Sequence, residues 1–266
     1  MTARRRRGLA FAVGTGRSGY QPDMNAEMIQ DRRASLSFVV ALTALVGVLA
    51  YCDFPVEWLV NSQLSPLRSY VSELAVAGQP ARSFFRVSDV VAGVGLIAVA
   101  NLLMRWPPTT QASVAHLCAM VAGISSMADG LWPMPCAPSI DMSCRAKEEA
   151  IHTTQVVQPH TASSLIGFTA LVCAIGLYGA VLTRHPGYGR LGAAGLSAAA
   201  AAALLGGVDV AMCLTSSTAW AGLVERLQIG VISAWLAALV IRAARDGVTV
   251  IDGCGPPRPQ PGAVPE

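Results

Sequence analysis

The chain has 266 residues, of which 53% are apolar and only 13% are charged, and its mean hydropathy is +0.49. Soluble globular domains carry about 25% charged residues, so this composition leaves too few polar side chains to cover a water-soluble body of this size. A soluble enzyme, a disordered protein and a nucleic-acid-binding protein are therefore disfavoured, and the net charge is only +3. The composition predicts one polytopic, all-α membrane domain.

Six apolar runs are long enough to cross the hydrocarbon core of a bilayer as helices. Gly and Pro residues punctuate the connections between them. We expect transmembrane helices at residues 34–52, 87–104, 112–130, 160–182, 191–213 and 222–241. Together they form a six-helix transmembrane domain at 34–242, preceded by a tail at 1–33 and followed by a Pro-rich, disordered tail at 243–266.

The basic residues predict the orientation of these helices. Lys147 is the only lysine, and most of the 19 basic residues fall on the side that holds both termini. The positive-inside rule places that side in the cytoplasm. Abundant arginine and alanine are typical of a high-GC bacterial genome, so we expect a multi-pass protein of the bacterial plasma membrane. No cleavable signal peptide is evident, and translation starts at Met1, Met24 or Met28.

The segment after the first span predicts a helix of about 12 residues, too short to cross a bilayer. Ser65 suits an N-cap, Pro66 suits the first helical position, and Gly78 suits the end. Apolar residues fall at i, i+3, i+4 and i+7, on one helical face: Leu67, Tyr70, Val71 and Leu74. This helix either lies in the outer interface or caps the bundle with its polar face turned inward.

Two cysteines, Cys136 and Cys144, lie in the loop at 131–159, on the predicted outer side where oxidation is possible. They enclose a short loop suited to a disulfide. Metal binding is a rival interpretation, because Cys136, Cys144, His152 and His160 recur every eight residues. Structural zinc sites usually place paired ligands two to four residues apart, so we expect no metal and no other cofactor.

Ionisable residues within the spans gather near the outer end of the expected bundle. Charges are expensive in a bilayer, and small residues share their helical faces, so these side chains face the interior. Arg226 is the only strong cation among them. We expect a polar cluster that opens outward and takes its ligand-binding side chains from Glu73, Asp89, Asp209, Glu225 and Arg226. A purely structural network, or snorkelling of residues near helix ends, would explain the same pattern.

Several short motifs carry a family resemblance. They are Ser-Glu-Leu-Ala at 72–75 with Gly78 and Pro80, Asp-Gly-Leu-Trp-Pro-Met at 129–134, His-Thr-Ala-Ser-Ser at 160–164, and Glu-Arg at 225–226. Over about residues 34–241 the chain resembles a bacterial integral-membrane family catalogued as domain of unknown function 998. The resemblance implies a six-helix architecture and marks Ser72, Glu73, Asp129, His160, Glu225 and Arg226, but it implies no substrate.

Three functions remain open at this point. The first is a non-enzymatic envelope protein that binds lipid or another ligand through its outer segment. The second is a lipid-modifying hydrolase or transferase, with Ser72 or Ser164 as nucleophile, His160 as base and Asp129 as its orienter. The third is a proton- or cation-coupled transporter that uses the acidic cluster. Membrane lipids are the expected partners in each, and nucleic acid is not.

Overall fold

The computed structural model describes residues 24–60, 63–103, 109–147, 158–215 and 219–246. Every regular element in these ranges is helical. The long helices are α1 (Met24–Tyr51), α2 (Arg82–Leu103), α3 (Thr110–Leu131), α5 (Pro159–Thr183), α6 (Gly189–Leu214) and α7 (Ala221–Arg245). Two short 3₁₀ helices, η1 (Phe54–Trp58) and η2 (Val71–Ala75), lie between α1 and α2.

Five helices, α2, α3, α5, α6 and α7, are long and apolar enough to cross a membrane. They correspond to the second to sixth predicted spans. The first predicted span falls on α1, and the stretch of α1 whose side chains the structure describes, Phe38–Tyr51, is apolar but by itself shorter than a full span. α1 begins at Met24, so it extends into the region that we expected to be an amino-terminal tail.

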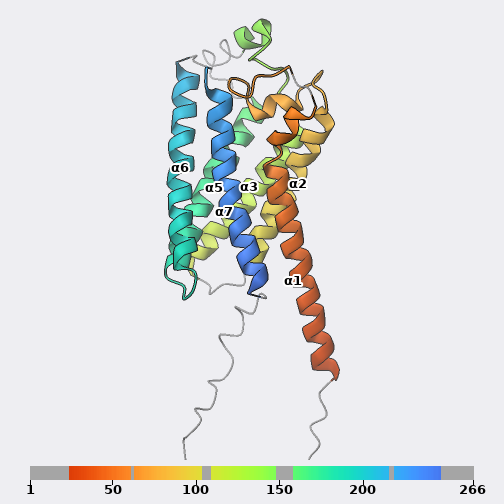
Figure 1. Cartoon of the computed structure of the whole chain (residues 1–266), viewed down its shortest axis with the longest axis vertical. Helices are drawn as coiled ribbons and strands as arrows, with labels where there is room; N and C mark the ends of the chain where they lie inside the picture. Colours follow the sequence, from red (N-terminus) through yellow and green to blue (C-terminus); the bar gives the residue numbers. More distant parts are fainter. Residues whose placement is uncertain (1–23, 61–62, 104–108, 148–157, 216–218, 247–266) are drawn as a thin grey trace, which may run out of the picture.

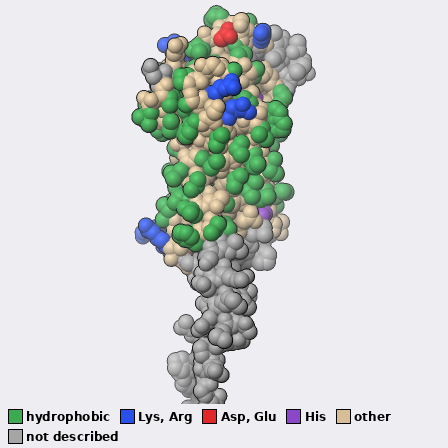
Figure 2. All heavy atoms as spheres, turned by 90° about the vertical axis from the view of Figure 1, so that its right-hand side faces the viewer, with side chains coloured by type: hydrophobic (Ala, Val, Ile, Leu, Met, Phe, Trp, Pro, Cys, Tyr) green, Lys and Arg blue, Asp and Glu red, His purple; other side chains and the backbone are tan. Residues whose placement is uncertain are grey.

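The long helices form a closed ring (Figure 1). Each packs against the next in chain order, and α7 returns to α1. Glycines permit close approach between neighbours: a Cβ on Gly47 of α1 would meet Cα of Gly95 on α2 at 2.2 Å. Apolar side chains cover much of the outer surface of the ring, as expected for a surface in contact with lipid (Figure 2).

The two ends of the ring differ. α1 begins and α7 ends at the lower end in Figure 1, which we call the inner end after the orientation expected from the arginines. There, Tyr188 donates a hydrogen bond to Asp246 at 2.6 Å, and Arg242 pairs with the same carboxylate at 2.9 Å. The connections α1–α2 and α3–α5 lie at the opposite, outer end. Above the inner end, a large apolar cluster that includes Leu182 and Leu239 fills the ring.

The expected 12-residue helix at 65–77 is wrong. We call residues 63–77 the roof segment, and only η2, at Val71–Ala75, is helical within it. Its backbone makes only isolated turns within the segment, such as Ser69 N–H to the Ser65 carbonyl at 2.8 Å. Other backbone groups are bonded to α7: Val71 N–H donates to Glu225, the Ser69 carbonyl accepts from Arg226, and the Leu67 carbonyl accepts from Leu223 N–H. These long-range partners replace the regular helical ladder that the local pattern predicts.

Candidate functional site

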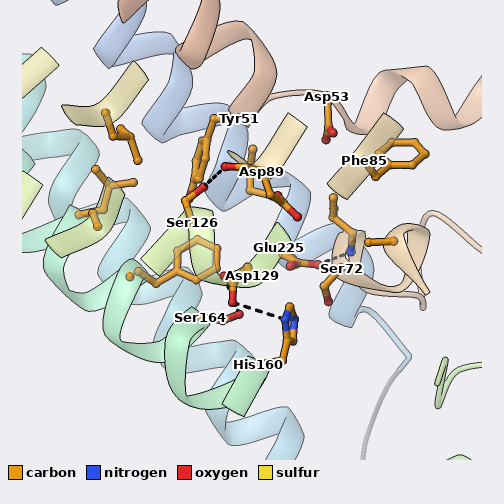
Figure 3. A pocket seen from close by; sticks show the side chains of 18 residues that line it. Tyr51, Asp53, Ser72, Phe85, Asp89, Ser126, Asp129, His160, Ser164 and Glu225 are labelled. Atoms are coloured by element: carbon orange, nitrogen blue, oxygen red, sulfur yellow. Dashed lines mark hydrogen bonds and ion pairs between the residues drawn. The ribbon is translucent and has the colours of Figure 1, made fainter. Parts of the chain in front are cut away.

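A cavity of about 80 Å³ lies within the ring at the outer end, beneath the roof segment (Figure 3). Every long helix except α6 contributes to its described lining. Its polar lining residues are Tyr51, Asp53, Ser72, Asp89, Ser126, Asp129, His160, Ser164 and Glu225. Leu96, Leu171 and Ile229 line the same cavity and connect it to apolar packing. A volume above about 10–15 Å³ admits a water molecule, so this cavity has room for a small polar group.

The Asp129 carboxylate is held by several neighbours from α5. Its Oδ1 accepts a short hydrogen bond from Ser163, and its Oδ2 accepts one from Ser164 at 3.0 Å. Nδ1 of His160 lies 3.4 Å from Oδ1 of Asp129, and the imidazole also hydrogen-bonds the backbone of Trp132. The Asp-Gly motif on α3 and the His-Thr-Ala-Ser-Ser motif on α5 therefore meet at one carboxylate.

Asp53 and Asp89 lie on the side of the cavity formed by α1 and α2 (Figure 3). Burial raises the pKa of Asp53 to about 7, and the nearby Glu57 carboxylate contributes to this increase. A hydrogen bond from the Ser88 side chain lowers the pKa and offsets part of the effect. Asp89 is deeply surrounded by protein atoms. In the part of the chain that the structure describes, no side-chain hydrogen bond or ion pair reaches its carboxylate. The hydroxyl of Ser126, on α3, donates to the backbone carbonyl of Asp89, at 2.8 Å.

Glu225 and Arg226 are adjacent on α7 but have different partners and different positions relative to the cavity. Oε2 of Glu225 lines the cavity and accepts from Val71 N–H at 2.5 Å, which fixes the roof segment. Arg226 does not line the cavity. Its guanidinium makes a bidentate pair with Glu57 and donates to the carbonyls of Ser69 and Gly222. Its donors are thus engaged by protein groups.

Glu73 does not line the cavity either and is 0% exposed. Its Oε1 accepts from Tyr70 N–H at 3.0 Å, and its Oε2 accepts from Ser139 Oγ at 2.5 Å and Ser139 N–H at 3.2 Å. Burial raises the pKa of Glu73, although the hydrogen bonds from Ser139 act in the opposite direction. Glu73 thereby joins the roof segment to the α3–α5 connection.

The α3–α5 connection contains a disulfide between Cys136 and Cys144, with Cα atoms 5.9 Å apart. Ser139 lies inside this nine-residue loop, and its carbonyl and that of Pro138 accept hydrogen bonds from Arg145. Residues 136–144, which we call the disulfide loop, are thus cross-linked at both ends and carry the Ser139 that hydrogen-bonds to Glu73.

The remaining candidates are less central. Ser72 lines the cavity, but its hydroxyl donates to Sδ of Met134 at 3.2 Å rather than to His160. Asp209 on α6 is not part of the lining and faces Tyr70 of the roof segment. Burial raises the pKa of the Tyr70 phenol, and the carboxylates of Asp209 and Glu225 add to the shift.

The metal interpretation finds no geometric support among the described residues. Within those ranges, no group of three or more His, Cys, Asp or Glu side chains is arranged to hold a metal ion. Cys136 and Cys144 are bonded to each other, and His160 lies beside Asp129. The remaining residue of that pattern, His152, is outside the described residues.

Sequence reasoning missed Tyr51, Asp53, Glu57 and Ser126. Asp53 and Glu57 follow the first apolar run, at a position where the sequence alone predicts that acidic residues belong to a solvated loop. One signal could have identified Glu57: a cation buried near a helix end requires an anionic partner, and the loop that follows the first span offers two acids.

Comparison with known proteins identifies a family for the chain. A family described as "Protein of unknown function (DUF998)" matches residues 41–242. The chain belongs to this family. The DUF998 region includes the five long apolar helices almost completely, together with the roof segment, the disulfide loop and every residue that lines the cavity. No curated protein and no solved structure matches the chain.

Proposed function

We propose that this DUF998 protein is a six-span protein of the bacterial plasma membrane, with both termini in the cytoplasm, that binds a lipid headgroup or small ligand in its outer cavity. α1 serves as the sixth span. It packs against α2 and α7, and its exposed side chains, such as Phe38, Leu42 and Leu49, are apolar. A signal-anchor helix in this position would complete the ring within the bilayer.

One observation carries the binding proposal: the cavity holds a buried carboxylate, Asp89, that no side chain among the described residues satisfies. A network that serves structure alone satisfies its members, because an unpaired buried charge is strongly destabilising. Arg226 and Glu57 are an example of such full pairing in the same protein. The cavity therefore has hydrogen-bonding capacity that the described residues leave unused.

The two alternative functions have weaker support. For a hydrolase or transferase, Asp129 and His160 form a suitable pair, but neither Ser72 nor Ser164 donates to His160: their hydroxyls bond Met134 and Asp129. For a transporter, a polar path would have to continue toward the inner end, where the apolar cluster fills the ring. A binding role needs neither feature.

The experiment compares two variants of the roof segment. Ser72→Phe places a large side chain at the cavity, whereas Leu67→Phe changes an exposed position on the same segment. Both proteins are purified in mild detergent, checked for a single monodisperse species, and analysed by mass spectrometry for retained small molecules and lipids. We expect one molecule retained by wild type and Leu67→Phe and lost from Ser72→Phe. Equal retention by all three would overturn the proposal.

A further inference from the structure

We propose that the outer cavity selects a cation, specifically an organic ammonium group. This inference rests on the proposed binding function and names the chemical class of its ligand. It follows from the charges around the cavity, from the unpaired state of one of them, and from the aromatic side chains that complete the wall.

The ionisable side chains around the cavity are predominantly acidic. Carboxylates reach it from four elements: Asp53 after α1, Asp89 on α2, Asp129 on α3 and Glu225 on α7. His160 is the only basic side chain in the described lining, and it lies against Asp129. Ionised carboxylates that share a poorly solvated site repel one another, so a bound cation favours their ionised forms, whereas a bound anion adds to the repulsion.

The partners of these carboxylates show where the cation would bind. Ser163 and Ser164 donate to Asp129, Val71 N–H donates to Glu225, and Ser88 bonds to Asp53. Asp89 alone among the four has no such donor in the described chain. Figure 3 shows its carboxylate directed into the space on the side of Glu225 and Asp129. An ammonium group placed there would donate charge-assisted hydrogen bonds to Asp89.

The rest of the wall favours an organic cation over a metal ion. Tyr51, Phe85 and Phe168 line the cavity, and ammonium groups are attracted to aromatic faces. The carboxylates come from separate helices, and the described residues include no group of three with metal-binding geometry. An ammonium group tolerates this spread because it combines hydrogen bonding with contact to aromatic and apolar surfaces.

The test uses three ligands of similar size and different charge: ethanolamine, ethylene glycol and glycolate. The thermal unfolding midpoint of the purified full chain is measured in neutral detergent at constant ionic strength, with NaCl as the salt control. We expect only ethanolamine to raise the midpoint with a saturable concentration dependence, because a ligand stabilises the state that it binds. An equal shift with ethylene glycol or glycolate would overturn the inference.

Two carboxylate variants localise the effect. Asp89→Asn keeps the shape of the side chain and removes its charge, so we expect the half-saturating ethanolamine concentration to rise about tenfold or more. Asp246→Asn removes a carboxylate at the inner end and should leave that concentration unchanged. An unchanged value for Asp89→Asn would also overturn the inference.

A lipid headgroup and a free amine present the same chemistry, and nanodiscs distinguish them. Preferential retention of phosphatidylethanolamine over phosphatidylglycerol, lost in Asp89→Asn, would identify the lipid as the source. Equal retention together with binding of free ethanolamine would identify a soluble amine, and both results support the inference. Retention of a molecule that carries no ammonium group in the Ser72→Phe comparison would overturn the cation inference while leaving the proposed binding function intact.

Discussion

Arg226 and Glu57 form a bidentate ion pair between residues 169 positions apart in the chain. Nε of Arg226 lies 2.9 Å from Oε1 of Glu57, and Nη2 lies 2.6 Å from Oε2. Glu57 is 3% exposed and Arg226 is 6% exposed. Because Nη1 also donates to the carbonyls of Ser69 and Gly222, one guanidinium fastens η1 and the roof segment to α7.

Breaking this pair is expected to destabilise the protein strongly. Removing one partner of a buried ion pair leaves the other charge uncompensated, which costs about 3–5 kcal/mol. We expect Glu57→Met and Arg226→Met each to lower the free energy of unfolding by that order, and the double variant to lose much less than the sum. Denaturant unfolding in detergent measures all three.

Arg242→Met, at an exposed pair with Asp246, is the control and should lose at most about 1 kcal/mol. Additive losses at Glu57 and Arg226 would contradict the pairing.

The sequence was informative where local pattern and membrane physics determine the structure. Five spans follow from hydropathy, and the inward direction of Asp89, Asp129 and His160 follows from the cost of charge in lipid. The roof segment was not predictable in this way, because α7, more than 140 positions away, supplies partners for its backbone. The same limit hid Glu57: nothing in the local sequence distinguishes a loop acid in water from one buried against Arg226.

The disulfide loop is expected to act as a latch on the roof segment. Ser139 connects it to Glu73 and, through a 2.7 Å hydroxyl contact, to Ser69. Removing the Ser139 hydroxyl or the cross-link should expose the cavity more often. The measurement is the rate at which a polar thiol reagent modifies a reporter cysteine, Ser164→Cys, in a background where the five cysteines other than Cys136 and Cys144 are alanine. We expect Ser139→Ala to raise this rate about threefold or more, and the Cys136→Ser, Cys144→Ser pair to raise it further.

Two controls keep the latch prediction testable. Ser143→Ala removes a hydroxyl that bonds only Asp141 within the same loop, so it should leave the labelling rate unchanged. In the same background without the reporter, labelling from outside should require a reductant, because both remaining cysteines are bonded to each other. Identical rates in the latch variants and the Ser143→Ala control would show that the loop does not restrain the roof segment.

Asp53 should make stability depend on pH. Its folded-state pKa of about 7 lies above the ordinary value of 3.8, so the folded protein binds this proton more tightly than the unfolded chain does. The unfolding free energy is therefore expected to fall as pH rises from about 4 to about 7, and Asp53→Asn should flatten that slope. Unfolding midpoints at pH 5, 6, 7 and 8 test this.

Asp141→Asn is the control, because hydrogen bonds from Ser143 and Cys144 lower the pKa of Asp141 and move its titration below this range. An unaltered slope in Asp53→Asn would rule out this role.

A variant of His160 distinguishes the binding function from the enzymatic one. If the Asp129–His160 contact serves the cavity structurally, His160→Ala should lower the unfolding free energy by about 1–3 kcal/mol, because a buried carboxylate loses a partner. Ser163→Ala, which removes another partner of the same carboxylate, should have an effect of the same order. Unfolding is measured together with turnover of bacterial lipid extract. A folded His160→Ala protein that has lost a lipid-dependent turnover present in wild type would favour the hydrolase or transferase interpretation.

The contact between Gly47 and Gly95 should decide whether α1 docks as the sixth helix of the ring. A Cβ at position 95 would meet Cα of Gly47 at 2.2 Å, and neither backbone can move aside without separating α1 from α2. We expect Gly95→Val to lower the unfolding free energy by at least about 1–3 kcal/mol, the usual penalty for overpacking. Gly207→Val is the matched control: it introduces the same side chain into a long helix where a Cβ has no atom within 4 Å, so it changes helix propensity without a clash. Thermal unfolding in detergent compares the two. Equal midpoints would mean that α1 does not depend on this crossing, and the proposal of six packed spans would lose its main contact.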